Sequence, residues 1–66
     1  MKELLQTDYV LYDPKADAVV CDTKFKTVIY GSMLEALEDK MDGEIVISCT
    51  DLPLHHQKVL IKEINS

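Results

Sequence analysis

The segment SCTDLPLHHQ, residues 48–57, holds the residue types of this chain that could do chemistry. Its reactive side chains are Cys49, Asp51, His55 and His56. Cys49, His55 and His56 could bind a metal ion together with Cys21. Two thiolates and two imidazoles form a ligand set that suits structural zinc. Cys49 also precedes a predicted helix, whose positive end lowers the pKa of a thiol, so a cysteine nucleophile is a second interpretation.

The spacing of these residues argues against both interpretations. Neighbouring residues of a helix point about 100° apart, so we expect the rings of His55 and His56 to diverge. Neither cysteine belongs to a Cys-x2-Cys pair, and the only glycines, Gly31 and Gly43, leave no glycine-rich loop for an oxyanion hole. We therefore predict no catalytic residue, no metal site and no cofactor, and keep a metal or thiol-redox protein as an alternative.

Composition and charge narrow the class of partner. The chain has 66 residues, of which 47% are hydrophobic and 29% charged, and this predicts one folded domain over residues 1–66. The chain has twelve acidic residues, seven lysines and no arginine, which gives a net charge of -5. Nucleic acid and anionic membranes are therefore poor partners, and a protein with a basic surface is a better one.

The first residues, MKELLQTDYV, contain no apolar core of a signal peptide, and no run approaches the roughly 18 apolar residues of a membrane span. We expect a cytoplasmic protein. In that compartment its two cysteines would be reduced and would pack as small hydrophobic side chains.

The first half of the chain predicts three strands. Residues 9–12 and 18–22 are rich in aromatic and branched side chains and flank the turn residues DPKAD, which indicates a hairpin. A third strand is predicted over residues 23–31, with Phe25, Thr27 and Ile29 on one face.

The second half predicts a helix, a strand and a helix. Ser32 and Glu35 form a capping box before a helix of residues 33–41, and Gly43 is placed to end it. The apolar side chains at helical spacing should pack on the sheet; they are Met33, Leu34, Ala36, Leu37 and Met41. A continuously apolar strand, residues 44–49, should lie at the centre of the sheet.

A C-terminal helix follows, capped by Thr50 or Asp51 and with Pro53 in its first turn. Its packing arc is formed by Leu54, Gln57, Leu60, Ile61 and Ile64. The order β-β-β-α-β-α predicts a small α+β domain with a mixed four-stranded sheet and both helices on one face.

Two sets of side chains are candidates for binding a protein. The acidic run EALEDKMDGE concentrates carboxylates that could meet a basic partner, although such runs are usually solvated helix faces. Its acids are Glu35, Glu38, Asp39, Asp42 and Glu44. The second set is tyrosines that could anchor an interface or lie half-buried in the core: Tyr9, Tyr12 and Tyr30.

The order of the segments YVLYD, VIYGS, the acidic helix and CTDLP resembles that of small uncharacterised proteins encoded by bacteriophages. The resemblance implies a cytoplasmic accessory protein that modulates a host or phage protein. We therefore expect a small acidic protein-interaction module, a modulator or inhibitor without catalysis. The alternative is a homodimeric accessory protein, in which a second copy covers the open face of the sheet.

Overall fold

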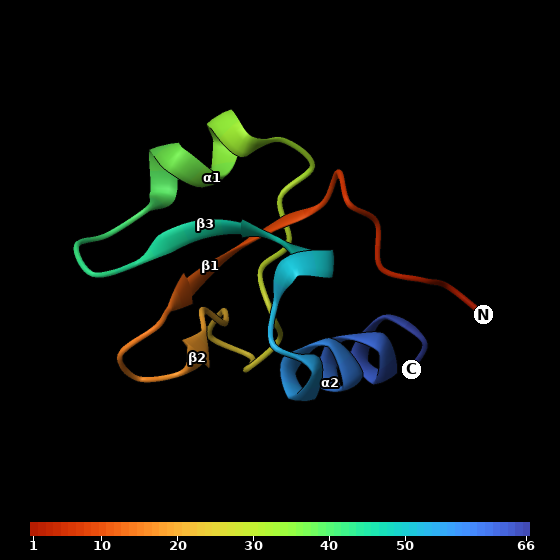
Figure 1. The fold of residues 1–66 in the computed structure, drawn as a ribbon. Coiled ribbons are helices and arrows are strands. Elements are labelled where there is room, and N and C mark those ends of the chain that lie inside the picture. The colour runs from red at the N-terminus through yellow and green to blue at the C-terminus, as the bar shows by residue number, and fades with distance from the viewer.

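Strand β1 (Tyr9–Asp13) lies at the centre of the sheet in the computed structural model, which describes residues 1–66 (Figure 1). β2 (Ala18–Val19) and β3 (Ile45–Ser48) pair with its two edges, and both pairings are antiparallel. The α+β class and the predicted hairpin are confirmed. The predicted four-stranded mixed sheet is wrong, because the sheet has three antiparallel strands, and β3 lies at its edge rather than at its centre.

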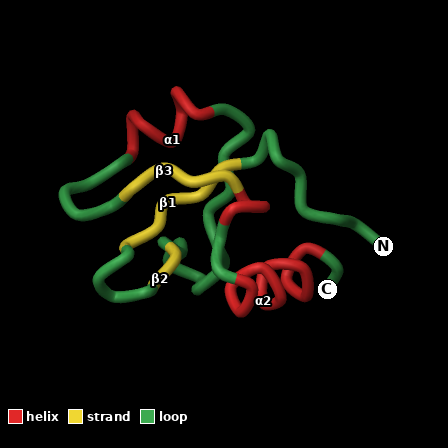
Figure 2. Tube along the Cα trace, viewed as in Figure 1, coloured by secondary structure: helices red, strands yellow, loops and turns green.

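The strand predicted over residues 23–31 is the missing fourth strand. Figure 2 shows this segment as a loop. A tight turn interrupts it, because Asp22 Oδ1 accepts the backbone N–H groups of Lys24 at 2.8 Å and Lys26 at 3.1 Å, and Phe25 has a φ of 61°. Isolated bridges are all that remains of the strand, and they join Cys21 to Thr27 and Tyr9 to Tyr30. A residue with left-handed backbone cannot continue a pleated strand. The alternation of polar and apolar residues over 23–31 therefore predicted a strand that does not form.

Alternation along β1 divides the interior into two parts. Val10 and Tyr12 face one side, where they form a cluster with Cys49, Leu52 and Leu60. Leu11, which is 2% exposed, points to the other side. The central strand is thus buried on both faces, which is unusual for a sheet this small.

Helix α1 (Met33–Asp39) begins where the capping box predicts, with Ser32 Oγ accepting the backbone N–H of Glu35 at 3.2 Å. Its last residue is Asp39, two residues before the predicted end at Met41, and Lys40 after it is extended. α1 contacts β1 and β3, but Ala36 is its only buried residue. The prediction that its whole apolar stripe packs on the sheet is therefore wrong.

Helix α2 (Leu54–Ile64) lies on the opposite side of the strands from α1 (Figure 1), so the prediction of both helices on one face is also wrong. Neither Thr50 nor Asp51 caps it, because they belong to the 3-10 turn η1 (Cys49–Asp51), and Pro53 occupies the N-cap position. The Gln57 side chain holds turn and helix together, since its Nε2 donates to the carbonyls of Thr50 and Leu52 at 3.0 and 2.7 Å.

The interior is small for the size of the chain. Only 8 of 66 residues are buried, and the molecule exposes 4868 Å². A folded monomer of 7.5 kDa is expected to expose about 4,250 Å². Large apolar side chains are part of the exposed surface, among them Phe25, Leu34 and Leu54.

Leu60 is the residue of α2 that is buried in the core cluster with Val10 and Tyr12 of β1. Because Leu60 is 2% exposed within the cluster, Leu60→Ala should lower the free energy of unfolding by about 2–5 kcal/mol. The neighbouring Val59 is 61% exposed, so Val59→Ala should change it by less than about 0.5 kcal/mol. Urea unfolding followed by circular dichroism measures both, and equal effects would contradict this packing.

Candidate functional site

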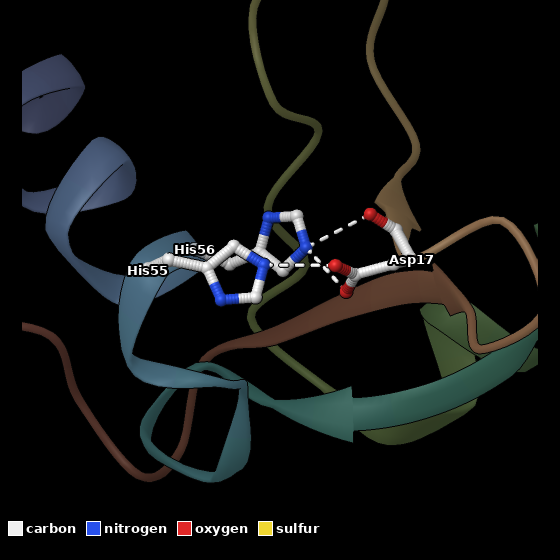
Figure 3. Close-up of side chains that lie close together, drawn as sticks. All are labelled: Asp17, His55 and His56. Carbon is white, nitrogen blue, oxygen red and sulfur yellow. Dashed lines mark hydrogen bonds and ion pairs between the residues drawn. The ribbon is translucent and has the colours of Figure 1, made fainter.

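Asp17, His55 and His56 meet on the surface where the turn between β1 and β2 approaches the start of α2 (Figure 3). His55 Nε2 lies 2.9 Å from Asp17 Oδ2, and His56 Nε2 lies 2.9 Å from Asp17 Oδ1. His56 Nε2 also lies 3.0 Å from the Asp17 carbonyl oxygen. Each imidazole therefore has its own carboxylate oxygen, and the cluster joins segments 38 residues apart in the sequence.

The turn that carries Asp17 is stabilised by the side chain of Asp13, four residues earlier. Asp13 Oδ1 accepts the backbone N–H groups of Lys15 at 3.0 Å and Ala16 at 3.3 Å, which closes the turn before Asp17. Asp17 itself is left-handed, with a φ of 51°, a conformation that aspartate adopts more readily than most residues. The turn thus holds the Asp17 carboxylate where α2 begins.

The two histidines converge, and the prediction that their rings diverge was wrong. Their ring centroids are 4.2 Å apart with an angle of 39° between the planes. Both residues lie in the first turn of α2, which begins at Leu54, and the Nε2 atoms of both rings face the Asp17 carboxylate. Sequence spacing missed this site because Asp17 belongs to a different element.

Tyr12 supports the carboxylate from the core. Its hydroxyl donates to Asp17 Oδ1 at 2.6 Å, and its ring meets the ring of His56 edge-on at a centroid distance of 5.6 Å. This hydrogen bond, together with burial and the nearby carboxylate charge, raises the pKa of Tyr12. Hydrogen bonds from Tyr12 and His56, and then from His55, lower the pKa of Asp17 to about 2 against the opposing effect of burial.

Neither cysteine joins this cluster. Cys49 is fully buried, and burial, aided by the charge of Asp8, raises the pKa of its thiol to about 11. A thiol that stays protonated at neutral pH is a poor nucleophile and a poor ligand, so the structure argues against the chemistry considered for Cys49. Cys21 is exposed, and both thiols are free.

Comparison of the chain with known protein families, with curated proteins and with solved structures finds no match. Function must therefore be argued from this chain alone. Neither helix has the length and apolar character needed to cross a membrane.

A small apolar pocket lies beside His56. Its volume is about 170 Å³, which is below the size of most small-molecule sites. Its walls come from β2, the loop after it, the segment before α2 and α2 itself: Val19, Cys21, Thr27, Leu52, His56, Val59 and Leu60. Glu63 holds the loop wall in place, because its carboxylate accepts the backbone N–H and the hydroxyl of Thr27 at 2.6 and 2.9 Å.

The candidate tyrosines do not form a common surface. Tyr12 is buried in the core and cannot serve as an interface residue while the fold is intact. Tyr9 and Tyr30 are half-buried and pair with each other across a bridge. The Tyr30 hydroxyl donates to Asp39 Oδ2 at 2.8 Å, and burial, with the Asp39 carboxylate, raises its pKa.

The acidic candidates remain available on α1 and after it. Glu35, Glu38 and Asp42 are exposed and their carboxylates make no hydrogen bond, whereas Asp39 is held by Tyr30. Glu44 is half-buried and Oε1 accepts the backbone N–H of Met41 at 2.9 Å. The first three carboxylates can therefore contact a partner without breaking an internal bond.

Beside these carboxylates lie apolar side chains that sequence reasoning placed in the core. We define the α1 face as Met33, Leu34, Leu37 and Met41, which are 50%, 74%, 48% and 70% exposed. Sequence reasoning also missed Phe25, which is 89% exposed at the tip of the turn after Asp22. Its left-handed backbone, rather than its alternation, decides its exposure.

The depressed pKa of Asp17 predicts acid sensitivity of the fold. A carboxylate with a lowered pKa stabilises the folded state above its ordinary pKa of 3.8, and this contribution is lost as pH falls toward about 2. Asp17→Asn should therefore lower stability at pH 6 and flatten its decline between pH 4 and 2. Asp51 is exposed, so Asp51→Asn should keep the slope of the unchanged chain. Urea midpoints across this range measure the slopes, and parallel curves for Asp17→Asn would contradict the assignment.

Proposed function

We propose that this chain is a small protein-interaction module that binds another protein through the α1 face and acts as a modulator or inhibitor by occupying a surface, without chemistry of its own. One observation carries this proposal. An amphipathic helix normally turns its apolar side to the core, but α1 buries only Ala36 and exposes the rest of its apolar stripe.

The grouping of these side chains distinguishes the α1 face from ordinary surface. Single exposed apolar residues are common on folded proteins and need no explanation. Here three of them lie on one short helix and Met41 follows shortly after it, and the whole molecule exposes more area than a monomer of its mass is expected to. A partner that covers this face would remove apolar area from water, which is the main driving force of protein association.

Charge indicates the chemistry of the partner. The exposed carboxylates of Glu35, Glu38 and Asp42 alternate along the sequence with the apolar residues of the α1 face, and Lys40 is the one lysine of this segment. An apolar groove bordered by lysine or arginine side chains would complement both features, in the manner of a helix bound in a groove. We extend the proposal to a phage or host protein as the bearer of that groove, because the order of the segments resembles that of phage-encoded accessory proteins.

A second copy of the chain is the competing occupant. β3 leaves one edge of the sheet unpaired, and Ile45 on it is 43% exposed, so two copies could meet there. Such a pairing would join two molecules that carry a net charge of -5 each. Like charges at an interface oppose association, which favours a different, basic partner.

The proposal predicts that binding depends on Leu34 and not on an equally exposed leucine elsewhere. Leu34→Ser should weaken the complex at least about tenfold, which corresponds to about 1.4 kcal/mol. Leu54 of α2 is 72% exposed, against 74% for Leu34, so Leu54→Ser is a matched control that should bind as the unchanged chain does. The measurement is affinity capture from the cells that encode the chain, followed by titration of the captured protein.

Four outcomes would overturn this proposal. An equal loss of binding affinity in Leu34→Ser and Leu54→Ser would place the interface elsewhere. A loss of affinity in Phe25→Ser alone would do so as well. Unchanged binding of a Glu38→Lys, Asp42→Lys double variant at low salt would remove the basic partner. A stable dimer of the 7.5 kDa chain in sedimentation, broken by Leu34→Ser, would assign the α1 face to a second copy.

A further inference from the structure

We propose that Asp17, His55 and His56 form a binding site for a divalent transition-metal ion, with Zn²⁺ as the physiological candidate. The site lies on the α2 side of the sheet and does not include the α1 face, so it is independent of the proposed protein interface. It also differs from the set considered on sequence grounds, because the Asp17 carboxylate takes the place of both thiols.

The donor atoms are already gathered. One ligand atom from each residue lies within 4.8 Å of the other two, and each imidazole Nε2 faces a different oxygen of the carboxylate at 2.9 Å. Ligands at 2.0–2.2 Å from a tetrahedral Zn²⁺ lie about 3.4 Å apart. Outward movements of about half an ångström would therefore admit the ion, which is within the reach of ordinary side-chain rotation.

The three ligand side chains differ in exposure, so that some can adjust to an ion while one is held by its packing. The side chains of His55 and Asp17 are 63% and 52% exposed and can adjust, whereas His56 is 18% exposed and lies against Tyr12. The Tyr12 hydroxyl holds Oδ1 of the carboxylate at 2.6 Å, which leaves Oδ2 on the exposed side. A hydrogen bond of this kind fixes a ligating carboxylate and strengthens metal binding.

The chemistry of the donors selects the class of ion. Two imidazole nitrogens and one carboxylate oxygen suit Zn²⁺, Cu²⁺ or Ni²⁺, whereas Ca²⁺ and Mg²⁺ require mostly oxygen ligands. The ion would replace the N–H groups that now face the carboxylate, so both imidazoles must carry their proton on Nδ1 in the bound state. Three protein ligands leave at least one position for water or for a donor from another molecule.

Binding would also join two distant segments. Asp17 precedes β2 and the histidines begin α2, so the ion would link the hairpin to the helix that closes the core. An ion that binds only the folded chain stabilises it in proportion to the logarithm of its concentration above the dissociation constant. A metal-dependent rise in melting temperature is therefore a second readout besides affinity.

Calorimetric titration of the chain, purified without a histidine tag and kept reduced, with Zn²⁺ tests this site. We expect one ion per chain with a Kd of about 10 μM or tighter, and a rise in melting temperature. Asp17→Asn and His55→Ala should each weaken binding at least about tenfold and abolish the thermal shift, and Tyr12→Phe should weaken it about tenfold through the lost hydrogen bond. His55 is mostly exposed, so His55→Ala should keep the circular dichroism spectrum of the fold.

Controls separate this site from the other possible ligands. Asp51→Asn and Cys21→Ser should bind Zn²⁺ as the unchanged chain does, and Co²⁺ should give ligand-field bands without a thiolate charge-transfer band. Loss of binding on Cys21→Ser, or a thiolate band, would assign the ion to the cysteines and overturn the proposal. Unchanged affinity in His55→Ala and Asp17→Asn, or a Kd above about 100 μM in the unchanged chain, would overturn it as well.

Discussion

Strand β1 is the segment on which the rest of the molecule depends, because its three middle residues are buried on both faces of the sheet. Val10 and Tyr12 form the cluster that receives α2, and Leu11 faces the side of α1. One short strand therefore has to supply apolar surface to two helices. In a chain of 66 residues this leaves too little interior for both, and α1 retains an uncovered apolar side.

The parts of the fold that were predictable are those decided by local contacts. The Ser32 N-cap places the start of α1, and turn residues place the β1–β2 hairpin, since both signals act within a few residues. The prediction that the apolar stripe of α1 is buried was wrong, because burial depends on how much sheet surface is available. The periodicity of the sequence does not reveal that area. The missing fourth strand has a different, local origin, because the turn closed by Asp22 and the left-handed Phe25 interrupt the alternating segment.

The site was less predictable than the fold. Residue types and spacing in the sequence indicated Cys49 and the histidine pair as candidates. Burial keeps the Cys49 thiol protonated and unreactive, and the two histidines form a cluster only through their contacts with Asp17. Asp17 carries no local signal beyond turn composition, because its importance comes from a contact across 38 residues. The geometric rule that neighbouring helical side chains diverge fails at the first turn, where an acceptor in front of the helix can be reached by both rings.

Asp17 also explains why the turn before β2 has an aspartate where glycine would relieve the backbone. A left-handed φ costs a non-glycine residue on the order of 1 kcal/mol, and aspartate less than most. Three side chains converge on this carboxylate, and their combined effect lowers its pKa to about 2. The backbone conformation and the side-chain cluster are thus coupled. A change that relaxed the turn would withdraw the carboxylate from Tyr12 and from both histidines, so hairpin, core and the start of α2 would respond together.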